Sequence, residues 1–152
     1  MLFRFEEILK ALGGTFLNEP HGEGVDSVTT DTRAITPNSL FIALAGERFD
    51  GHEFLETAIS KGASLLCVER TKLGKLPAGA PAIAVDSTVE AYQALARFHR
   101  LRLPVKAIAL TGSSGKTSAK EMLRAIFARA SGTEHVLATE GNTNNQIGVP
   151  QN

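Results

Sequence analysis

One short stretch constrains this chain more than any other. An apolar run, Val105–Leu110, leads directly into the segment TGSSGKT at residues 111–117. Backbone N–H groups in a glycine turn and at the start of a helix point into one concavity, where they can bind phosphate oxygens. The Lys116 ammonium would add a positive charge for the β- and γ-phosphates, and the Thr117 hydroxyl could ligate Mg²⁺. The pattern therefore predicts a phosphate-binding loop between a strand and a helix.

The spacing of this loop departs from the usual P-loop, because two residues rather than four separate Gly112 from Gly115. The residues that follow support the prediction, since apolar side chains recur at the spacing of one helical face. These are Ala119, Met122, Leu123, Ile126, Phe127 and Ala130. We thus expect a helix of about three turns after the loop.

The predicted loop gives a first set of site residues. Lys116 and Thr117 are the candidate catalytic residues, and Thr117 is the candidate ligand of Mg²⁺. The predicted ATP-binding residues are Thr111, Gly112, Ser113, Ser114, Gly115, Lys116, Thr117 and Ser118.

Composition limits the classes of protein that remain. Of 152 residues, 43% are hydrophobic and 21% are charged, which is ordinary for a globular protein. Sixteen basic residues balance sixteen acidic ones, so nucleic acid is not an expected partner. The amino terminus lacks the apolar core of a signal peptide, and no apolar run reaches the ~20 residues of a membrane span, which predicts a cytoplasmic protein. The single cysteine, Cys67, lies in an apolar run and is interpreted as a small buried hydrophobe rather than a nucleophile.

Periodicity along the chain predicts an α/β fold. Helices are indicated near residues 5–12, 54–60, 88–103 and 116–130, and the second of these is preceded by Asp50 and Glu53, which could cap it. Strands are indicated at residues 27–32, 40–44, 65–68, 82–85 and 105–110. We expect a small amino-terminal α/β domain over residues 1–85 and the start of a P-loop mononucleotide-binding α/β domain over residues 86–152. The second is short for a complete sheet of this kind, so the sequence predicts a truncated domain.

Three polar segments could form a binding site. They are VTTDTR at residues 28–33, GERFDGH at residues 46–52 and GNTNNQIGVP at residues 141–150. Each also has a purely structural interpretation: an ion-paired turn, a helix cap and an amide-rich loop. His52 could line a cleft, but a lone loop histidine is more often solvated.

Taken together and in order, four segments resemble the Mur ligases of bacterial peptidoglycan synthesis. They are VTTDTR, LFIALAGERFDGHEF, TGSSGKTSAKEML and GNTNNQIGVP. The Lys120-Glu121-Met122 run resembles the branch that adds D-alanyl-D-alanine more than the branch that adds diaminopimelate or lysine. The match covers nearly the whole chain.

The resemblance implies an enzyme of three domains: the first holds the UDP end of the substrate, the second binds ATP with Mg²⁺, and the third closes over the dipeptide. In this family ATP phosphorylates the terminal carboxylate of the substrate, and the amine of the incoming residue attacks the acyl phosphate. The implied substrates are UDP-N-acetylmuramoyl-tripeptide and D-alanyl-D-alanine. Further family elements, a Mg²⁺-binding glutamate and a modified lysine among them, should lie beyond Asn152, so the 152-residue chain is expected to be inactive alone.

The resemblance also implies roles for individual residues. Thr30, Thr32, Glu47, Arg48 and Phe49 match positions that contact the uridine nucleotide, and Asn142–Asn145 match the segment near the sugar-peptide part. The complete set of predicted substrate-binding residues is Thr30, Asp31, Thr32, Arg33, Glu47, Arg48, Phe49, Asn142, Thr143, Asn144 and Asn145.

Two other hypotheses remain open at this point. The chain could be a small P-loop kinase or NTPase complete in itself, or a nucleotide-binding module without turnover. A complete NTPase would need a second, acidic strand that ligates Mg²⁺.

Overall fold

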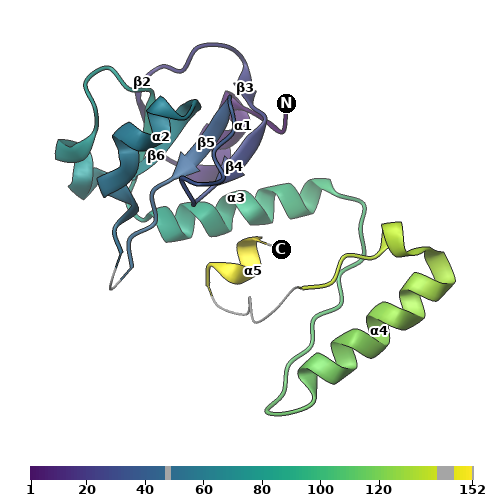
Figure 1. Cartoon of the computed structure of the whole chain (residues 1–152). Coiled ribbons are helices and arrows are strands. Elements are labelled where there is room, and N and C mark those ends of the chain that lie inside the picture. The colour runs from purple at the N-terminus through teal and green to yellow at the C-terminus, as the bar shows by residue number, and fades with distance from the viewer. Residues whose placement is uncertain (47–48, 140–145, 152) are drawn as a thin grey trace. The chain divides into compact units, whose positions relative to one another are not determined.

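The computed structural model describes residues 1–46, 49–139 and 146–151, and the chain forms two compact units, Met1–Arg100 and Leu101–Asn152. The first unit is built on a five-stranded sheet with the order β2-β7-β6-β5-β4 (Figure 1). Strands β4 to β7 are mutually parallel, and β2 pairs antiparallel with β7. The strands are β2 (Thr15–Asn18), β4 (Ser27–Thr29), β5 (Ser39–Ile42), β6 (Ala63–Glu69) and β7 (Ala82–Val85).

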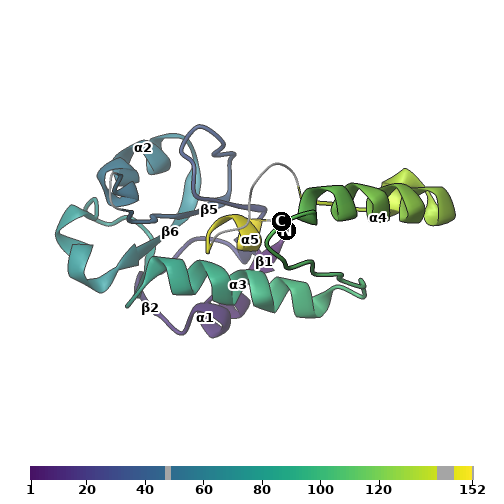
Figure 2. The ribbon, with the colours of Figure 1, turned by 90° about the horizontal axis from the view of Figure 1, so that it is seen from below.

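Helices cover both faces of this sheet. Figure 2 shows α1 and α3 on one side of it and α2 on the other. The helices are α1 (Phe5–Leu12), the 3₁₀ turn η1 (Gly51–Phe54), α2 (Leu55–Ser60), the 3₁₀ turn η2 (Arg70–Lys75) and α3 (Thr88–Arg102). A separate two-stranded ribbon pairs β1 (Phe3–Arg4) with β3 (Gly24–Val25).

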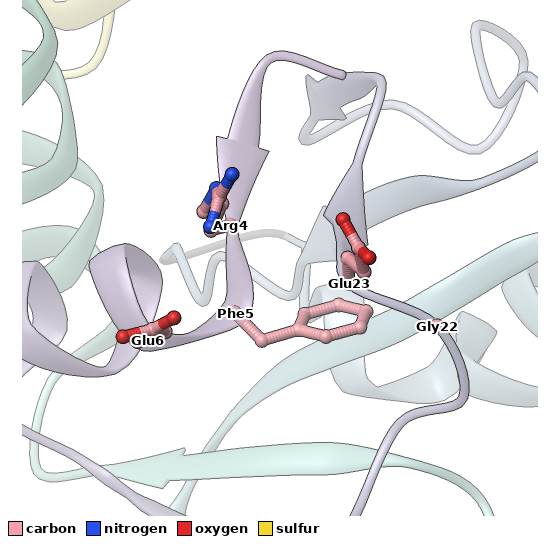
Figure 3. A pocket seen from close by; sticks show the side chains of 5 residues that line it. All are labelled: Arg4, Phe5, Glu6, Gly22 and Glu23. Atoms are coloured by element: carbon pink, nitrogen blue, oxygen red, sulfur yellow. The ribbon is translucent and has the colours of Figure 1, made fainter.

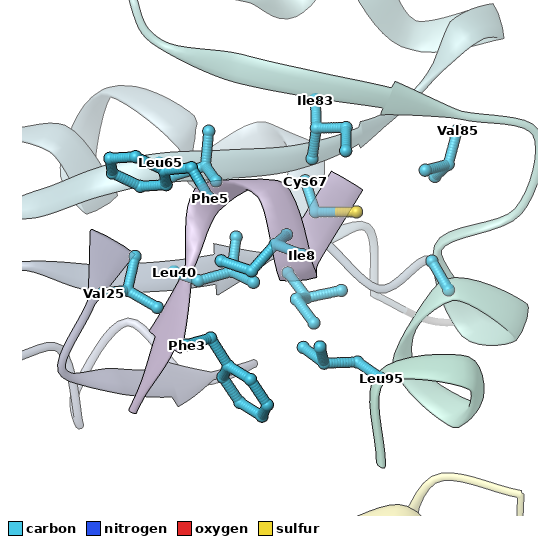
Figure 4. Packing of buried hydrophobic residues seen from close by; sticks show 12 residues of the cluster. Phe3, Phe5, Ile8, Val25, Leu40, Leu65, Cys67, Ile83, Val85 and Leu95 are labelled. Carbon is cyan, nitrogen blue, oxygen red and sulfur yellow. The ribbon is translucent and has the colours of Figure 1, made fainter. Parts of the chain in front are cut away.

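The central strands are apolar on both faces because helices bury both faces. Along β6, Leu65 and Cys67 enter the core beneath α1 and α3, whereas Leu66 and Val68 enter the core beneath α2. In the first core, Ile8 of α1 and Leu95 of α3 pack with Leu40, Leu65 and Ile83 (Figure 4). Burial raises the pKa of the Cys67 thiol to about 12, so this residue is a small buried hydrophobe, as predicted.

The second unit contains α4 (Lys116–Ser131), the 3₁₀ turn η3 (Thr133–His135) and α5 (Gly148–Gln151). The helix predicted after the glycine loop is confirmed. The strand predicted at residues 105–110 is wrong: this segment has no regular secondary structure. A strand requires ladder hydrogen bonds to a neighbouring strand. The described part of the second unit contains no strand with which residues 105–110 could pair.

The first unit also extends further than the predicted boundary at residue 85. Ala91 and Leu95 of α3 are buried in the core with Phe3 and Ile8, so the helix belongs to the first unit up to Arg100. The start of α3 is as predicted, since Ser87 Oγ accepts a hydrogen bond from the Glu90 N–H at 3.3 Å. Within the described residues, no helix has the length and apolar character needed to cross a membrane.

Candidate functional site

The predicted polar segments of the first unit gather at one edge of its sheet. Because β4, β5, β6 and β7 are parallel, the loops that follow them leave from the same edge. These loops are residues 30–33, residues 43–50, η2 and the start of α3. The carboxyl edge of a parallel sheet is where α/β proteins bind ligands, so the topology brings together segments that lie far apart in sequence.

The loop after β4 forms an ion-paired turn. The Arg33 Nε donates to Asp31 Oδ1 at 3.0 Å, its terminal NH2 lies 2.6 Å from Asp31 Oδ2, and the Arg33 N–H donates to Oδ1 at 2.8 Å. This guanidinium lowers the pKa of Asp31 to about 2. Thr30 and Thr32 are half-buried, and the Thr32 carbonyl accepts from Lys61 Nζ at 2.9 Å. Asp31 thus engages Arg33, as the structural interpretation of this segment predicted.

The loop after β5 is a short hairpin that presents an aromatic ring. Ala45 and Asp50 form an isolated antiparallel bridge, and the Gly46 N–H donates to the Phe49 carbonyl at 2.8 Å. The Phe49 ring is 57% exposed and stacks on Phe54 of η1, with ring centroids 5.1 Å apart and an interplanar angle of 15°. The predicted site residues Glu47 and Arg48 lie outside the described part of the chain.

Asp50, at the base of this hairpin, lies at the centre of a charged cluster. Its Oδ2 accepts from Lys75 Nζ at 2.8 Å and lies 3.2 Å from Lys72 Nζ, both from η2. Its Oδ1 accepts from the His52 N–H at 3.0 Å, which caps η1. The Lys75 ammonium, with His52 and Lys72, holds the pKa of Asp50 well below its usual range.

The position of His52 differs from the expectation of a solvated loop histidine. Its side chain is fully buried, with Nδ1 2.6 Å from Asp50 Oδ1. The one local signal for this arrangement is Asp50 two residues before it, since an aspartate often accepts from the N–H two residues on. The second partner of the ring, the Glu69 N–H at 3.0 Å, comes from β6, and no local pattern could have indicated it.

The predicted phosphate loop of the second unit leads into an uncapped helix start, a kind of backbone that can bind anions. Residues 111–115 form an irregular loop, and Lys116–Ser118 form the first turn of α4. Gly115, at the N-cap, has a left-handed φ of 77° that favours glycine. No side chain of the described residues caps this end, so the first N–H groups of α4 remain available to an anion.

The space around the phosphate loop is also open. A Cβ at Gly115 would meet nothing within 4 Å, and the nearest contact of one at Gly112 would be the Ser114 carbonyl at 3.7 Å. Lys116 Nζ donates to the Gly112 carbonyl across the loop, so its ammonium already lies against the cradle. The two glycine positions are therefore open, and the phosphate-binding role of this loop stays a prediction.

Two further regions lie outside the loops described above. Asn142, Thr143, Asn144 and Asn145 lie outside the described residues, although Lys120 of α4 donates to the Thr139 carbonyl just before them at 2.6 Å. A cavity of about 360 Å³ is lined by Arg4, Phe5, Glu6, Gly22 and Glu23 (Figure 3) and contains none of the predicted site residues. Among the described residues, no group of three or more His, Cys, Asp or Glu side chains could hold a metal ion.

Comparison with known families decides where the chain belongs. Residues 24–106, more than half of the chain, match the model described as Mur ligase family, catalytic domain. The chain belongs to the Mur ligase family. Residues 110–152, which include the phosphate loop, match the Mur ligase middle domain.

Curated relatives of this Mur ligase chain include proteins named "UDP-N-acetylmuramoyl-tripeptide--D-alanyl-D-alanine ligase". The protein from Escherichia coli is 48% identical over 83% of this chain and 26% of its own length. The protein from Treponema pallidum is 42% identical over 99% of this chain and 34% of its own length. The chain thus spans about a third or less of the relatives it matches.

Solved structures of relatives agree with the fold. MurF from Acinetobacter baumannii matches with a TM-score of 0.83 and 35% identity over 98% of this chain and 32% of its own. MurF from Thermotoga maritima, solved in complex with ADP, matches with a TM-score of 0.71 and 30% identity over 83% of this chain and 28% of its own.

Proposed function

We propose that this chain is the amino-terminal part of an ATP-dependent ligase that joins D-alanyl-D-alanine to UDP-N-acetylmuramoyl-tripeptide in peptidoglycan precursor synthesis. The observation that carries the proposal is the 48% identity to the Escherichia coli enzyme of that name, over 126 residues. The order of the two family matches, 24–106 and then 110–152, supports the same assignment.

In this proposal the first unit binds the UDP end of the substrate at the carboxyl edge of its sheet. Phe49 offers an exposed, flat apolar ring in the loop after β5, and Asp50 of the same loop contacts Lys72 and Lys75 of η2. An aromatic ring of this kind suits a nucleotide base, and N–H and ammonium donors suit a diphosphate.

The second unit binds ATP through the loop at residues 111–118. The backbone N–H groups at the start of α4 and the Lys116 ammonium would hold the phosphates. The Thr117 hydroxyl would be one ligand of Mg²⁺, which when bound neutralises charge on the phosphates. The Lys116 side chain would stabilise negative charge on the phosphoryl group as it passes from ATP to the substrate carboxylate and ADP leaves. The amine of D-alanyl-D-alanine would then attack the acyl phosphate, forming the amide bond and releasing phosphate and a proton.

A binding experiment on the 152-residue chain tests these assignments. Isothermal titration calorimetry should show separate binding of UDP-N-acetylmuramoyl-tripeptide and of ATP with Mg²⁺. In the ligand-free Gly115→Ala variant, residue 115 relaxes away from the left-handed φ that Gly115 adopts. ATP binding must then restore this φ, which costs an alanine about 1–2 kcal/mol. We expect ATP to bind roughly 5- to 30-fold more weakly, with UDP-substrate binding unchanged.

Gly74→Ala is the matched control, because a Cβ there meets open space and no left-handed φ is required. It should leave both affinities unchanged. ATP binding without any UDP-substrate binding would contradict the proposal and favour a separate P-loop NTPase or nucleotide-binding module.

A further inference from the structure

The buried imidazole of His52 has a defined hydrogen-bonding state. Its Nε2 is 3.0 Å from the Glu69 N–H, and a backbone N–H can only donate, so this nitrogen is the acceptor and carries no proton. Nδ1 therefore carries the proton and donates to Asp50 Oδ1 at 2.6 Å. His52 is thus a neutral imidazole in a single tautomer, with both ring nitrogens satisfied.

These two bonds connect the hairpin to the sheet. Asp50 closes the Ala45–Asp50 bridge, and Glu69 is the last residue of β6. The Gly51 N–H, next to His52, donates to the Leu44 carbonyl at 2.8 Å on the other side of the hairpin. The imidazole consequently joins the base of the hairpin to the carboxyl end of a neighbouring strand.

The same turn sets the position of the exposed aromatic ring. Phe54 lies two residues after His52 in η1 and stacks on Phe49 at the hairpin. The ammonium groups of Lys72 and Lys75 hold the other oxygen of Asp50, so the carboxylate is fixed from both sides. Movement of His52 would therefore displace Asp50, the hairpin and the Phe49 ring together.

We propose that His52 is a positioning residue for the uridine nucleotide: through Asp50 and Glu69 it fixes the Ala45–Asp50 hairpin so that the Phe49 ring faces the base. This inference rests on the proposed function of the first unit. His52 itself, being buried, does not touch the ligand.

Nuclear magnetic resonance of the ligand-free chain tests the first half of the inference. The ¹⁵N shifts of His52 should show a protonated Nδ1 and an unprotonated Nε2. His52→Phe fills the volume but makes neither hydrogen bond, so the Gly46 and Gly51 amides should exchange with solvent at least about tenfold faster. His52→Gln, which keeps a donor and an acceptor, should restore most of the protection. The opposite tautomer, or unchanged exchange in His52→Phe, would overturn the inference.

Calorimetry with UDP tests the second half. His52→Phe should bind UDP about tenfold more weakly, and His52→Gln should recover most of the affinity. His52→Asn serves if His52→Phe does not fold, because Asn can reach Asp50 but is too short to reach Glu69. Ile83→Val is the matched control: it loosens the core without touching the hairpin, so UDP affinity should stay unchanged.

The outcomes separate the two proposals. Absence of UDP binding by the unaltered chain would overturn the proposed function, and with it the role of His52 toward a nucleotide. Normal UDP affinity in a folded His52→Phe or His52→Asn chain would overturn the positioning role alone.

Discussion

Two aspartates at the carboxyl edge of the sheet are kept ionised by neighbouring cations and hydrogen-bond donors. Arg33 lowers the pKa of Asp31 to about 2, from an ordinary value of 3.8. Lys75, His52 and Lys72 lower the pKa of Asp50 below its usual range. A carboxyl group whose pKa is lower in the folded chain stabilises the fold above its unfolded pKa, and this contribution is lost as the pH falls toward the folded pKa.

The first unit should therefore lose stability between about pH 5 and pH 2. Tyr92 is the only tyrosine and the chain has no tryptophan, so its fluorescence during urea unfolding reports on α3 and the first unit. Asp50→Asn should be less stable than the unaltered chain at pH 7, and its stability should vary less over this pH range. Asp86→Asn is the control, since the Asp86 side chain is 92% exposed. An unchanged pH dependence in Asp50→Asn would contradict the prediction.

Local sequence signals predicted only part of the chemistry at this scale. The Asp31–Arg33 pair and the Asp50 cap involve residues two apart, and both interpretations were available from the sequence. The contacts of Asp50 with Lys75 and of His52 with Glu69 span 25 and 17 residues. They depend on β5 and β6 being neighbours, which side-chain periodicity alone does not specify.

At the scale of elements, α3 and α4 show what periodicity can and cannot predict. Both helices form where the apolar spacing indicated them. In α3, Ala91 and Leu95 are buried in the core. In α4, the side chain of Met122 is 67% exposed and that of Ile126 is 61% exposed. Apolar periodicity therefore predicted that this helix forms but not whether its apolar face is buried. The wrong strand at residues 105–110 and the missed edge strand β2 have the same cause, because strands form only with a neighbour.

The burial of α3 leads to a test of the unit boundary. Leu95→Ala removes a side chain that packs with Phe3 and Ile8 and should destabilise the first unit by about 2–5 kcal/mol. Arg97→Ala, on the exposed side of the same helix, should change stability by no more than about 0.5 kcal/mol. Thermal and urea unfolding followed at Tyr92 measure both. Equal effects would show that α3 is not part of the folded first unit.

At the scale of the whole molecule, the proposed function assigns one binding role to each of the two units. The first unit has a complete sheet with both faces covered and an edge lined by polar loops. The second unit has an uncapped helix start at α4, where we propose that phosphate binds. Phosphoryl transfer, however, needs positioned groups on both sides of the transferring phosphorus. The described residues of the second unit provide Lys116 and Thr117 on one side and no acidic metal-binding cluster opposite them.

We therefore expect the purified 152-residue chain to bind nucleotide phosphates but to form no ADP above background. The assay supplies ATP, Mg²⁺, UDP-N-acetylmuramoyl-tripeptide and D-alanyl-D-alanine, and compares the chain with Lys116→Ala. Without groups that fix the γ-phosphoryl from the far side, the substrate carboxylate is not held in line for attack. ADP formation that requires both substrates and disappears in Lys116→Ala would refute this, because it would mean that the described cradle and substrate edge suffice for the ligase reaction.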